Sequence, residues 1–391
     1  MIYRGIATFG LDTGTCPRWL FERMVKLGRE IVRIIIEEYT ADEFVTRIGD
    51  PVWFQSLGTV LAFDWNASGL TTILTAALKE AIRGNEKYFG LYICGGKGAT
   101  SRKTPEEIKK WGEILSLPPN HTENLVYNSK MSAKVDNALV QDGFQIYHHA
   151  FFFTVKKNQI GSWTVVQQGM NTIKATARRY HWHSAKITDL VCEPHSGIVS
   201  AIKTPTLDLT SKKSSDNRQI STQLVQNSFG ELMKDIKIIR KHSSSLSKMI
   251  TLQSPKGQLT LLNLENKEFK YHPVMEEDFN KSKYLEKILW NVCQQKPKNY
   301  EKLLAVEGVG PKTIRALSLV AEVIYGAKPS YEDPARYSFA HGGKDRTPYP
   351  VDRQTYDQSI IFFRKVVPKM KVPESDKKKM LERLNLYPPR I

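Results

Sequence analysis

The segment that most limits what this chain can fold into lies at residues 299–326, where two apolar helical patterns flank a Gly-Val-Gly turn. A short amphipathic stretch at 300–306 leads into the turn at 308–310, and Pro311 opens a second helical stretch. Glycine at both ends of so short a turn lets the backbone reverse and approach another backbone closely. Proline is favoured in the first turn of a helix, where its missing N–H costs nothing. The sequence therefore predicts a tight hairpin of two helices.

The start of the second helix carries the features of a phosphate-binding site. Backbone amides there point outward and can hold a phosphate oxygen, while Lys312 and Arg315 add positive charge. The pattern resembles the helix-hairpin-helix motif of DNA repair and processing proteins, which contacts the sugar–phosphate backbone without reading sequence. That resemblance implies DNA contacts at Gly308, Gly310, Lys312 and Arg315. The alternative is a hairpin that only packs against the rest of the protein.

The overall charge agrees with a polyanionic partner. The 391 residues hold 57 Lys and Arg against 40 Asp and Glu, a formal net charge of +17, which favours nucleic acid. The four cysteines stand singly, without a CxxC pair, which argues against a zinc ribbon or a cysteine-ligated iron–sulfur cluster. No apolar run approaches the roughly 20 residues of a membrane span. We therefore expect a soluble, cytoplasmic, nucleoid-associated protein with no membrane partner.

Three regions are expected along the chain. Residues 1–202 are predicted to form an α/β (α+β) domain, because period-two aromatic segments at 144–155 and 161–169 favour strands and helical patterns precede them. Residues 203–280 are predicted to be a linker and helical connector, since they begin with a Ser-, Thr- and Lys-rich stretch. Residues 281–391 are predicted to be an all-α region that carries the helix-hairpin-helix.

The hairpin also suggests a catalytic reaction. In the glycosylase/lyase branch of the helix-hairpin-helix superfamily, a lysine two residues after the turn forms a Schiff base with the sugar, and an aspartate that opens a later helix assists. The matching residues here are Lys312 and Asp352. A helix N-terminus disfavours the ammonium and so favours the neutral amine that imine formation needs. The separation of the two residues is longer than usual for that branch. A phosphate contact for Lys312 and a helix cap for Asp352 are the alternative roles.

Blocks along the whole chain resemble one family. They include YRGIATFGLDTG at 3–14, FDWNASGLTT at 63–72, AKVDNALVQDGFQIYHH at 133–149 and HGGKDRTPYPVDR at 341–353. The family comprises archaeal and thermophilic bacterial proteins, long described as a domain of unknown function and associated with cleavage of DNA at abasic sites. The resemblance implies an abasic-site (AP) lyase of DNA base excision repair whose N-terminal fold differs from the standard glycosylase folds. It leaves the reactive lysine open.

Two other segments contain a lysine that could supply the reactive amine. Lys97 lies in a glycine-rich basic loop with Arg102 and Lys103, which suits phosphates or a reactive amine but lacks the spacing of a Walker loop. Lys344 lies in a Gly-Gly loop shortly before Asp352 and is an alternative to Lys312. Exposed turns that merely carry charge are the other interpretation of both loops.

A pair two residues apart, Lys134 and Asp136, would share one face if that stretch were extended. An amine beside a carboxylate fits Schiff-base chemistry, and a simple ion pair is the alternative.

A segment that mixes basic and aromatic residues is a second candidate DNA surface. We expect a helix over 171–183, and its Arg178, Arg179, His181 and Trp182 suit phosphate contacts and stacking on an unpaired base. A solvated helix face is the alternative.

Histidines support a rival class of enzyme, a metal-dependent nuclease. The possible ligands are His148, His149, His181, His183 and His195 with Asp136 and Glu193. His148 and His149 are neighbours in a strand and should point to opposite faces, so at most one is expected to point inward. No HExxH spacing is present.

The preferred reaction is metal-free and cofactor-free. A lysine attacks C1′ of the ring-opened abasic sugar, and β-elimination then expels the 3′ phosphate. A metal-dependent nuclease and a non-catalytic, structure-specific DNA-binding protein are the alternatives. Excision of a damaged base by a bifunctional glycosylase/lyase stays open, as does the oligomeric state.

Overall fold

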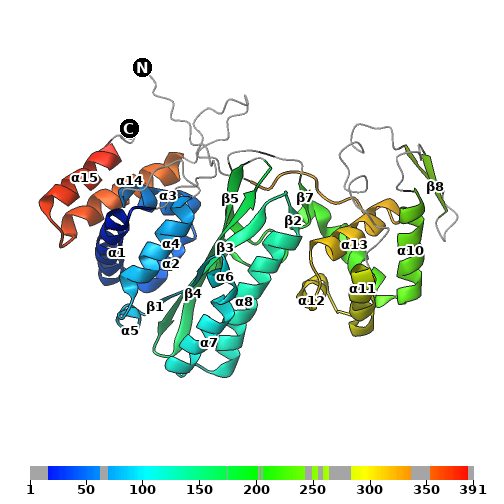
Figure 1. Ribbon diagram of the computed structural model, residues 1–391, viewed down its shortest axis with the longest axis horizontal. Helices are drawn as coiled ribbons and strands as arrows, with labels where there is room; N and C mark the ends of the chain where they lie inside the picture. The colour runs from blue at the N-terminus through cyan, green and yellow to red at the C-terminus, as the bar shows by residue number, and fades with distance from the viewer. Residues whose placement is uncertain are drawn as a thin grey trace, which may run out of the picture.

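The computed structural model describes residues 16–61, 69–173, 175–200, 203, 206–242, 249–253, 259–263, 283–335 and 353–385. Within these ranges the fold is a mixed α/β structure in which helices cover both faces of an antiparallel sheet (Figure 1). No helix in the described ranges is both long enough and apolar enough to cross a membrane.

The central sheet has the order β1-β3-β4-β5-β6, and every neighbouring pair is antiparallel. Its strands are β1 (Leu91–Lys97), β3 (Gln145–Lys156), β4 (Gln159–Asn171), β5 (Thr176–His183) and β6 (His195–Ser200). The two strands predicted from period-two aromatics are confirmed as β3 and β4. Two small ladders lie outside this sheet, β2 (Val140–Gln141) with β7 (Leu207–Asp208) and β8 (Met249–Gln253) with β9 (Leu259–Asn263).

The helix expected over 171–183 is wrong, because most of this stretch is strand β5 inside the sheet. Its burial pattern explains the error. From Ala177 to His183 every residue is buried, so polar and apolar side chains follow one another without the alternation that marks a half-exposed strand.

One face of the sheet is covered by the first helices, and we call it the α4 face. These helices are α1 (Arg18–Glu38), α2 (Ala41–Ile48), α3 (Pro51–Val60) and α4 (Gly69–Ile82), with the single turn α5 (Glu86–Phe89) leading into β1. Helices α1 and α2 are separated at Thr40, whose side chain accepts a hydrogen bond from Glu43 N at 3.0 Å and caps α2. Strand residues Leu91, Ile93 and Phe152 belong to the core under these helices.

The alternate strand residues Tyr92, Cys94 and Phe151 point to the opposite face, which we call the α8 face. It is covered by α7 (Thr104–Ile114) and α8 (Pro119–Ala138), which follow the short α6 (Ala99–Arg102). The same core continues into a helical group beyond α8 (Figure 1). That group contains α9 (Ser215–Gln226), α10 (Phe229–His242), α11 (Lys283–Gln295), α12 (Tyr300–Ala305) and α13 (Pro311–Val323).

Helices from the second and third of the regions expected from the sequence contribute to the cores on the two faces of the sheet. Helix α9 lies inside the predicted linker, yet Leu224 and Val225 are part of the α8-face core. The last helices, α14 (Arg353–Val366) and α15 (Glu374–Asn385), pack with α1 and α3 rather than with α11–α13 (Figure 1). Phe363 stacks on Trp53 with ring centroids 5.3 Å apart. The C-terminal helices therefore complete the core of the N-terminal half.

Candidate functional site

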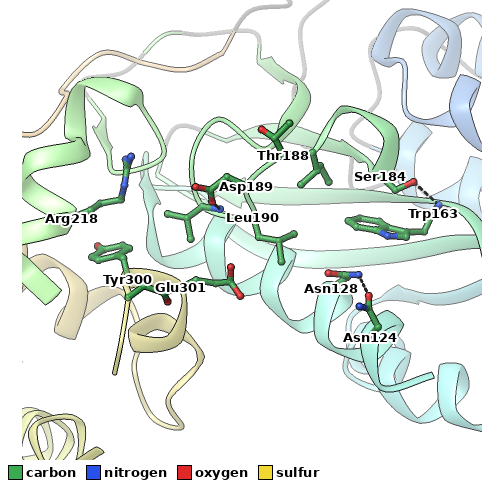
Figure 2. Close-up of a pocket in the computed structure, with 13 residues that line it drawn as sticks. Asn124, Asn128, Trp163, Ser184, Thr188, Asp189, Leu190, Arg218, Tyr300 and Glu301 are labelled. Carbon is green, nitrogen blue, oxygen red and sulfur yellow. Dashed lines mark hydrogen bonds between the residues drawn. The ribbon is translucent and has the colours of Figure 1, made fainter. Parts of the chain in front are cut away.

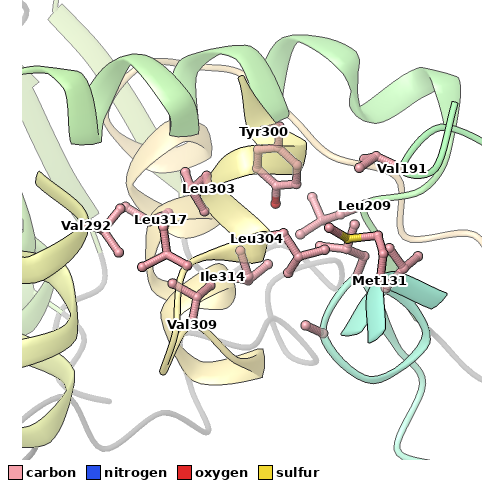
Figure 3. Close-up of a cluster of buried hydrophobic side chains, with 14 of the residues drawn as sticks. Met131, Val191, Leu209, Val292, Tyr300, Leu303, Leu304, Val309, Ile314 and Leu317 are labelled. Atoms are coloured by element: carbon pink, nitrogen blue, oxygen red, sulfur yellow. The ribbon is translucent and has the colours of Figure 1, made fainter. Parts of the chain in front are cut away.

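The helices predicted around the Gly-Val-Gly turn are present as α12 and α13, and Figure 3 shows their apolar contacts, which include Leu303, Ile314 and Leu317. Gly308 has φ +82°, and a Cβ at that position would lie 2.3 Å from Ile288 Cδ1. This turn therefore needs glycine for its conformation and for space. Gly310 differs, because its backbone is extended and an added Cβ would meet nothing within 4 Å.

The first turn of α13 offers backbone donors. Gly310 is the N-cap residue and supplies no capping side chain, and Pro311 holds the first helical position. The amides of Lys312 and Thr313 are thus left without a side-chain cap. Lys312 is exposed. Arg315, also expected at this site, is half-buried and donates from Nε to Gln141 Oε1 at 2.6 Å.

Helix α8 and strand β2 hold this hairpin in place. Lys134 Nζ donates to the carbonyl oxygens of Leu304 at 2.7 Å and Val306 at 2.8 Å, where α12 ends. Gln141 Nε2 donates to Pro311 O at 3.1 Å. Burial lowers the pKa of Lys134. The proposed pairing of Lys134 with Asp136 is not formed, since this stretch is helical and the two side chains have different partners.

The glycine-rich segment at the end of β1 presents Lys97. Gly96 and Gly98 flank this lysine with φ of +150° and +60°, and Gly98 N donates to Tyr147 O at 2.8 Å. A Cβ on Gly95 would lie 2.2 Å from His149 O. Lys97, Arg102 and Lys103 are all exposed, as a basic surface loop requires. The backbone that carries Lys97 is therefore one that only glycine neighbours allow.

Four polar side chains follow one another across the α4 face of the sheet. In the strand register Lys97 stands opposite His148, His148 opposite Gln168, and Gln168 opposite Arg179. Residues directly opposite in a ladder share a face. We call these four residues the polar row. Three of its members are completely buried and Lys97 is exposed, so the row runs from the sheet interior to the surface.

Helix α4 fixes the tautomer of His148. The Thr75 hydroxyl donates to Thr71 O at 2.8 Å, so Thr75 Oγ1 accepts from His148 Nε2 at 3.1 Å. His148 Nδ1 is then an unprotonated acceptor, and within the described residues it has no hydrogen-bond partner. Burial lowers the pKa of His148 to about 3, and the positive charge of Lys97 acts in the same direction. The imidazole is neutral at neutral pH.

Helix α3 contributes to the other end of the row. Arg179 donates to Gln55 Oε1 at 3.2 Å and from Nε to His181 Nε2 at 2.8 Å. Burial lowers the pKa of Arg179 to about 9. In the described part of the chain Gln55 Nε2 and Thr71 Oγ1 are buried without a hydrogen-bond partner. Buried unpaired polar atoms are uncommon in proteins, and three of them gather around the row.

The basic and aromatic residues of β5 are not available for direct DNA contact in this structure. Arg178, Arg179, His181 and Trp182 are completely buried. On the α8 face Arg178 forms ion pairs with Asp142 at 2.8 Å and Asp333 at 2.7 Å. The expected surface role fails because helices cover both faces of the strand on which these residues lie.

The α8 face carries its own buried polar network around Asp136. Trp182 Nε1 donates to Asp136 Oδ2 at 3.0 Å, and His195 Nε2 lies 2.5 Å from Oδ1. Gln167 Nε2 donates to Oδ2 at 2.5 Å, and Gln167 Oε1 lies 2.9 Å from His149 Nδ1. Burial raises the pKa of Asp136 against these interactions.

The sheet separates the histidines that were considered as metal ligands. His148, His181 and His183 lie on the α4 face, whereas His149 and His195 contact the Asp136 network on the α8 face. The prediction that His148 and His149 face opposite ways is confirmed. The prediction that at most one points inward is wrong, because both rings are buried. The described ranges contain no group of three His, Cys, Asp or Glu residues arranged to hold a metal ion.

A cavity of about 680 Å³ lies between α8, the segment 184–191 and the start of α12 (Figure 2). Asn124, Asn128 and Trp163 line one side of it, and Tyr300 and Glu301 line another. None of the residues expected at a site from the sequence lies in its wall. Lys344 and Asp352, two of the candidate catalytic residues, fall outside the described residues.

The polar row could not be read from the sequence. Its members, at 97, 148, 168 and 179, span more than eighty residues of the chain, and only the pairing of the strands aligns them. Two sequence features belong to the row, the glycines on either side of Lys97 and the basic residues of β5. Each of them predicts a separate site.

Comparison with known proteins identifies a family without assigning an activity. The sequence profile of a family described as a protein of unknown function, DUF763, matches residues 5–351. No curated protein and no solved structure is significantly similar to the chain. Because the match covers most of the chain, this protein belongs to the DUF763 family.

Proposed function

We propose that this protein is a DNA-binding AP lyase that cleaves the strand 3′ to an abasic site without a metal ion. The observation that carries the proposal is the α12–α13 hairpin, whose second helix begins with uncapped amides beside the exposed Lys312. In a chain with a net charge of +17, this arrangement favours a bound phosphate group. The open surface at Gly310 leaves room for a DNA backbone.

The hairpin is suited to holding DNA because it is rigid. Lys134 and Gln141 bind its backbone carbonyls, and its apolar residues continue the α8-face core. Preorganised donors lose little freedom when a ligand binds. The hairpin would therefore contribute affinity without base specificity, as contacts to the phosphate backbone do.

The proposed reaction needs only an amine and the abasic sugar. A lysine Nζ gives up a proton and attacks C1′ of the ring-opened sugar, and loss of water leaves an imine. The imine acidifies C2′. A base removes a C2′ proton, the electrons of that C–H bond form the C2′=C3′ double bond, and the C3′–O bond breaks with its electrons on the departing phosphate. Water then hydrolyses the imine and restores the lysine. Among the described candidates, Lys312 and Lys97 are exposed.

The test uses two duplexes in excess EDTA, one with a natural abasic site and one with a tetrahydrofuran analogue. The analogue has no C1′ aldehyde and cannot form an imine. We expect the abasic strand to be cut, with an unsaturated aldehyde on its 3′ end and a phosphate on the 5′ end, while the analogue stays intact. Cleavage of both duplexes only after a divalent metal is added would support a nuclease instead. Binding without cleavage would leave a DNA-binding protein.

A further inference from the structure

We propose that Lys97, the exposed end of the polar row, supplies the amine of the lyase reaction in place of Lys312, and that the buried members of the row lie beneath this reaction site. This inference rests on the function proposed above and adds the identity of the catalytic residue. It is drawn from the strand register that joins Lys97 to His148, Gln168 and Arg179, and from the unpaired buried atoms beside them.

Lys97 lies at the surface on a strand of the central sheet. It is the exposed end of a row whose other members are buried. Next to it, Gly98 N binds Tyr147 O on β3. Rigid elements hold a reacting group more accurately than loops do. No hydrogen bond or ion pair joins the Lys97 amine to another described residue, in contrast to Lys79, which pairs with Glu107 at 2.7 Å.

A buried histidine stands opposite Lys97 in the strand pairing. His148 presents an unprotonated Nδ1 that has no partner in the described part of the chain. Its ring is fixed by Thr75 and is completely buried. A buried acceptor that stays unpaired costs free energy, and a catalytic role is one of the reasons for which such groups are retained. Gln55 Nε2 and Thr71 Oγ1 add a second and a third unpaired polar atom on the helices above the row.

Lys312 is suited to a different role. Its neighbours in the first turn of α13 are backbone amides, which attract a phosphate. A lysine that binds a phosphate acts as a charged ammonium. A neutral amine is required for attack on C1′. Lys312 would then hold the DNA backbone, and Lys97 would react with the sugar.

The experiment is borohydride trapping of the imine on a duplex with one abasic site, in EDTA and at saturating protein. We compare the wild type with Lys97→Arg and Lys312→Arg, because arginine keeps the charge and removes the primary amine. Lys109→Arg, an exposed position on α7, is the matched control. Lys97→Arg should lower the trapping rate by about 100-fold or more. Lys312→Arg keeps the charge that a phosphate contact needs, so it should still bind DNA and still form the adduct.

The results separate the two proposals. An adduct that forms with wild type and Lys312→Arg but not with Lys97→Arg supports the assignment. An adduct that persists in Lys97→Arg and is lost in Lys312→Arg overturns the assignment and leaves the lyase proposal intact. Absence of any adduct with the wild type would overturn both. Circular dichroism of each variant shows whether a loss of trapping is a loss of folding.

Discussion

Lys97 and His148 stand directly opposite each other in the pairing of β1 with β3, the lysine exposed and the histidine completely buried. The imidazole is tied to Thr75 of α4 through Nε2 and leaves Nδ1 unpaired among the described residues. The pairing of β1 with β3 thus places a surface amine next to a buried polar residue of the sheet. This relationship links a loop feature of the sequence to a fixed position in the fold.

The two glycines of the hairpin turn should respond differently to alanine. Gly308→Ala forces a side chain into φ +82° and toward Ile288, and we expect it to lower the free energy of unfolding by about 1–3 kcal/mol. Gly310→Ala meets open space and should leave stability nearly unchanged. If DNA approaches the backbone at Gly310, Gly310→Ala should still weaken DNA binding. Urea unfolding and DNA titration of both variants check this. Equal destabilisation by the two would contradict the described turn.

Salt dependence tests the phosphate contact proposed at α13. Lys312→Ala should weaken binding of any duplex sequence to a similar extent, because the contact is to the backbone. It should also reduce the slope of log K against log salt by about 1. Fluorescence anisotropy at several salt concentrations provides both quantities. A slope that matches the wild type would remove Lys312 from the interface.

Lys134 should contribute to the stability of the fold. Lys134→Met removes the charged donor from two carbonyls at the end of α12, and we expect a loss of about 1–3 kcal/mol in the free energy of unfolding. Lys130→Met, on the same helix but exposed, should change it by less than about 0.5 kcal/mol. Chemical denaturation of the two variants makes the comparison. Similar losses would mean that the carbonyl contacts contribute little.

Stability should fall in acid partly because of His148. Its pKa is about 3 in the folded chain, whereas an unfolded histidine titrates near 6.5. Between these values the unfolded state binds the extra proton, so each pH unit of acidification costs up to about 1.4 kcal/mol. His148→Gln removes this dependence. The stability difference between wild type and variant should therefore shrink by about 2 kcal/mol from pH 7 to pH 5. A stability difference between wild type and His148→Gln that is the same at pH 7 and pH 5 would show that the His148 ring is protonated or exposed in the folded protein.

The C-terminal helices should be part of the N-terminal core. Phe363 of α14 is completely buried against Trp53, and Phe363→Ala should cost about 3–5 kcal/mol. Ile361 on the same helix is 44% exposed, so Ile361→Ala should cost far less. Thermal unfolding distinguishes the two. A small effect at Phe363 would mean that α14 does not close this core.

The sequence predicted local features better than long-range ones. Strands β3 and β4 and the helices on either side of the glycine turn followed from periodicity and from the positions of glycine and proline. Strand β5 was mistaken for a helix because it is buried on both faces. Its buried Arg178 depends on Asp142 and Asp333, which are distant in sequence.

The same limit applies to the candidate site. Lys97 was recognised from its glycine neighbours, but its place beside His148 depends on strand pairing across about fifty residues of chain. Likewise α9 looked like part of a linker because polar residues dominate it. The structure buries Asn217 of this helix, whose side chain donates to Ser318 O at 3.0 Å and Ala327 O at 2.7 Å. A polar residue can be assigned to a core only when its hydrogen-bond partners are known.

The most direct test of the account is to locate the adduct itself. Wild-type protein is trapped with borohydride on an abasic duplex in EDTA, digested, and the modified peptide is sequenced by mass spectrometry. We predict one modified residue, Lys97, in the segment that ends β1. Modification of another amine would contradict the assignment of the reaction centre, and the absence of an adduct would contradict imine chemistry in this protein.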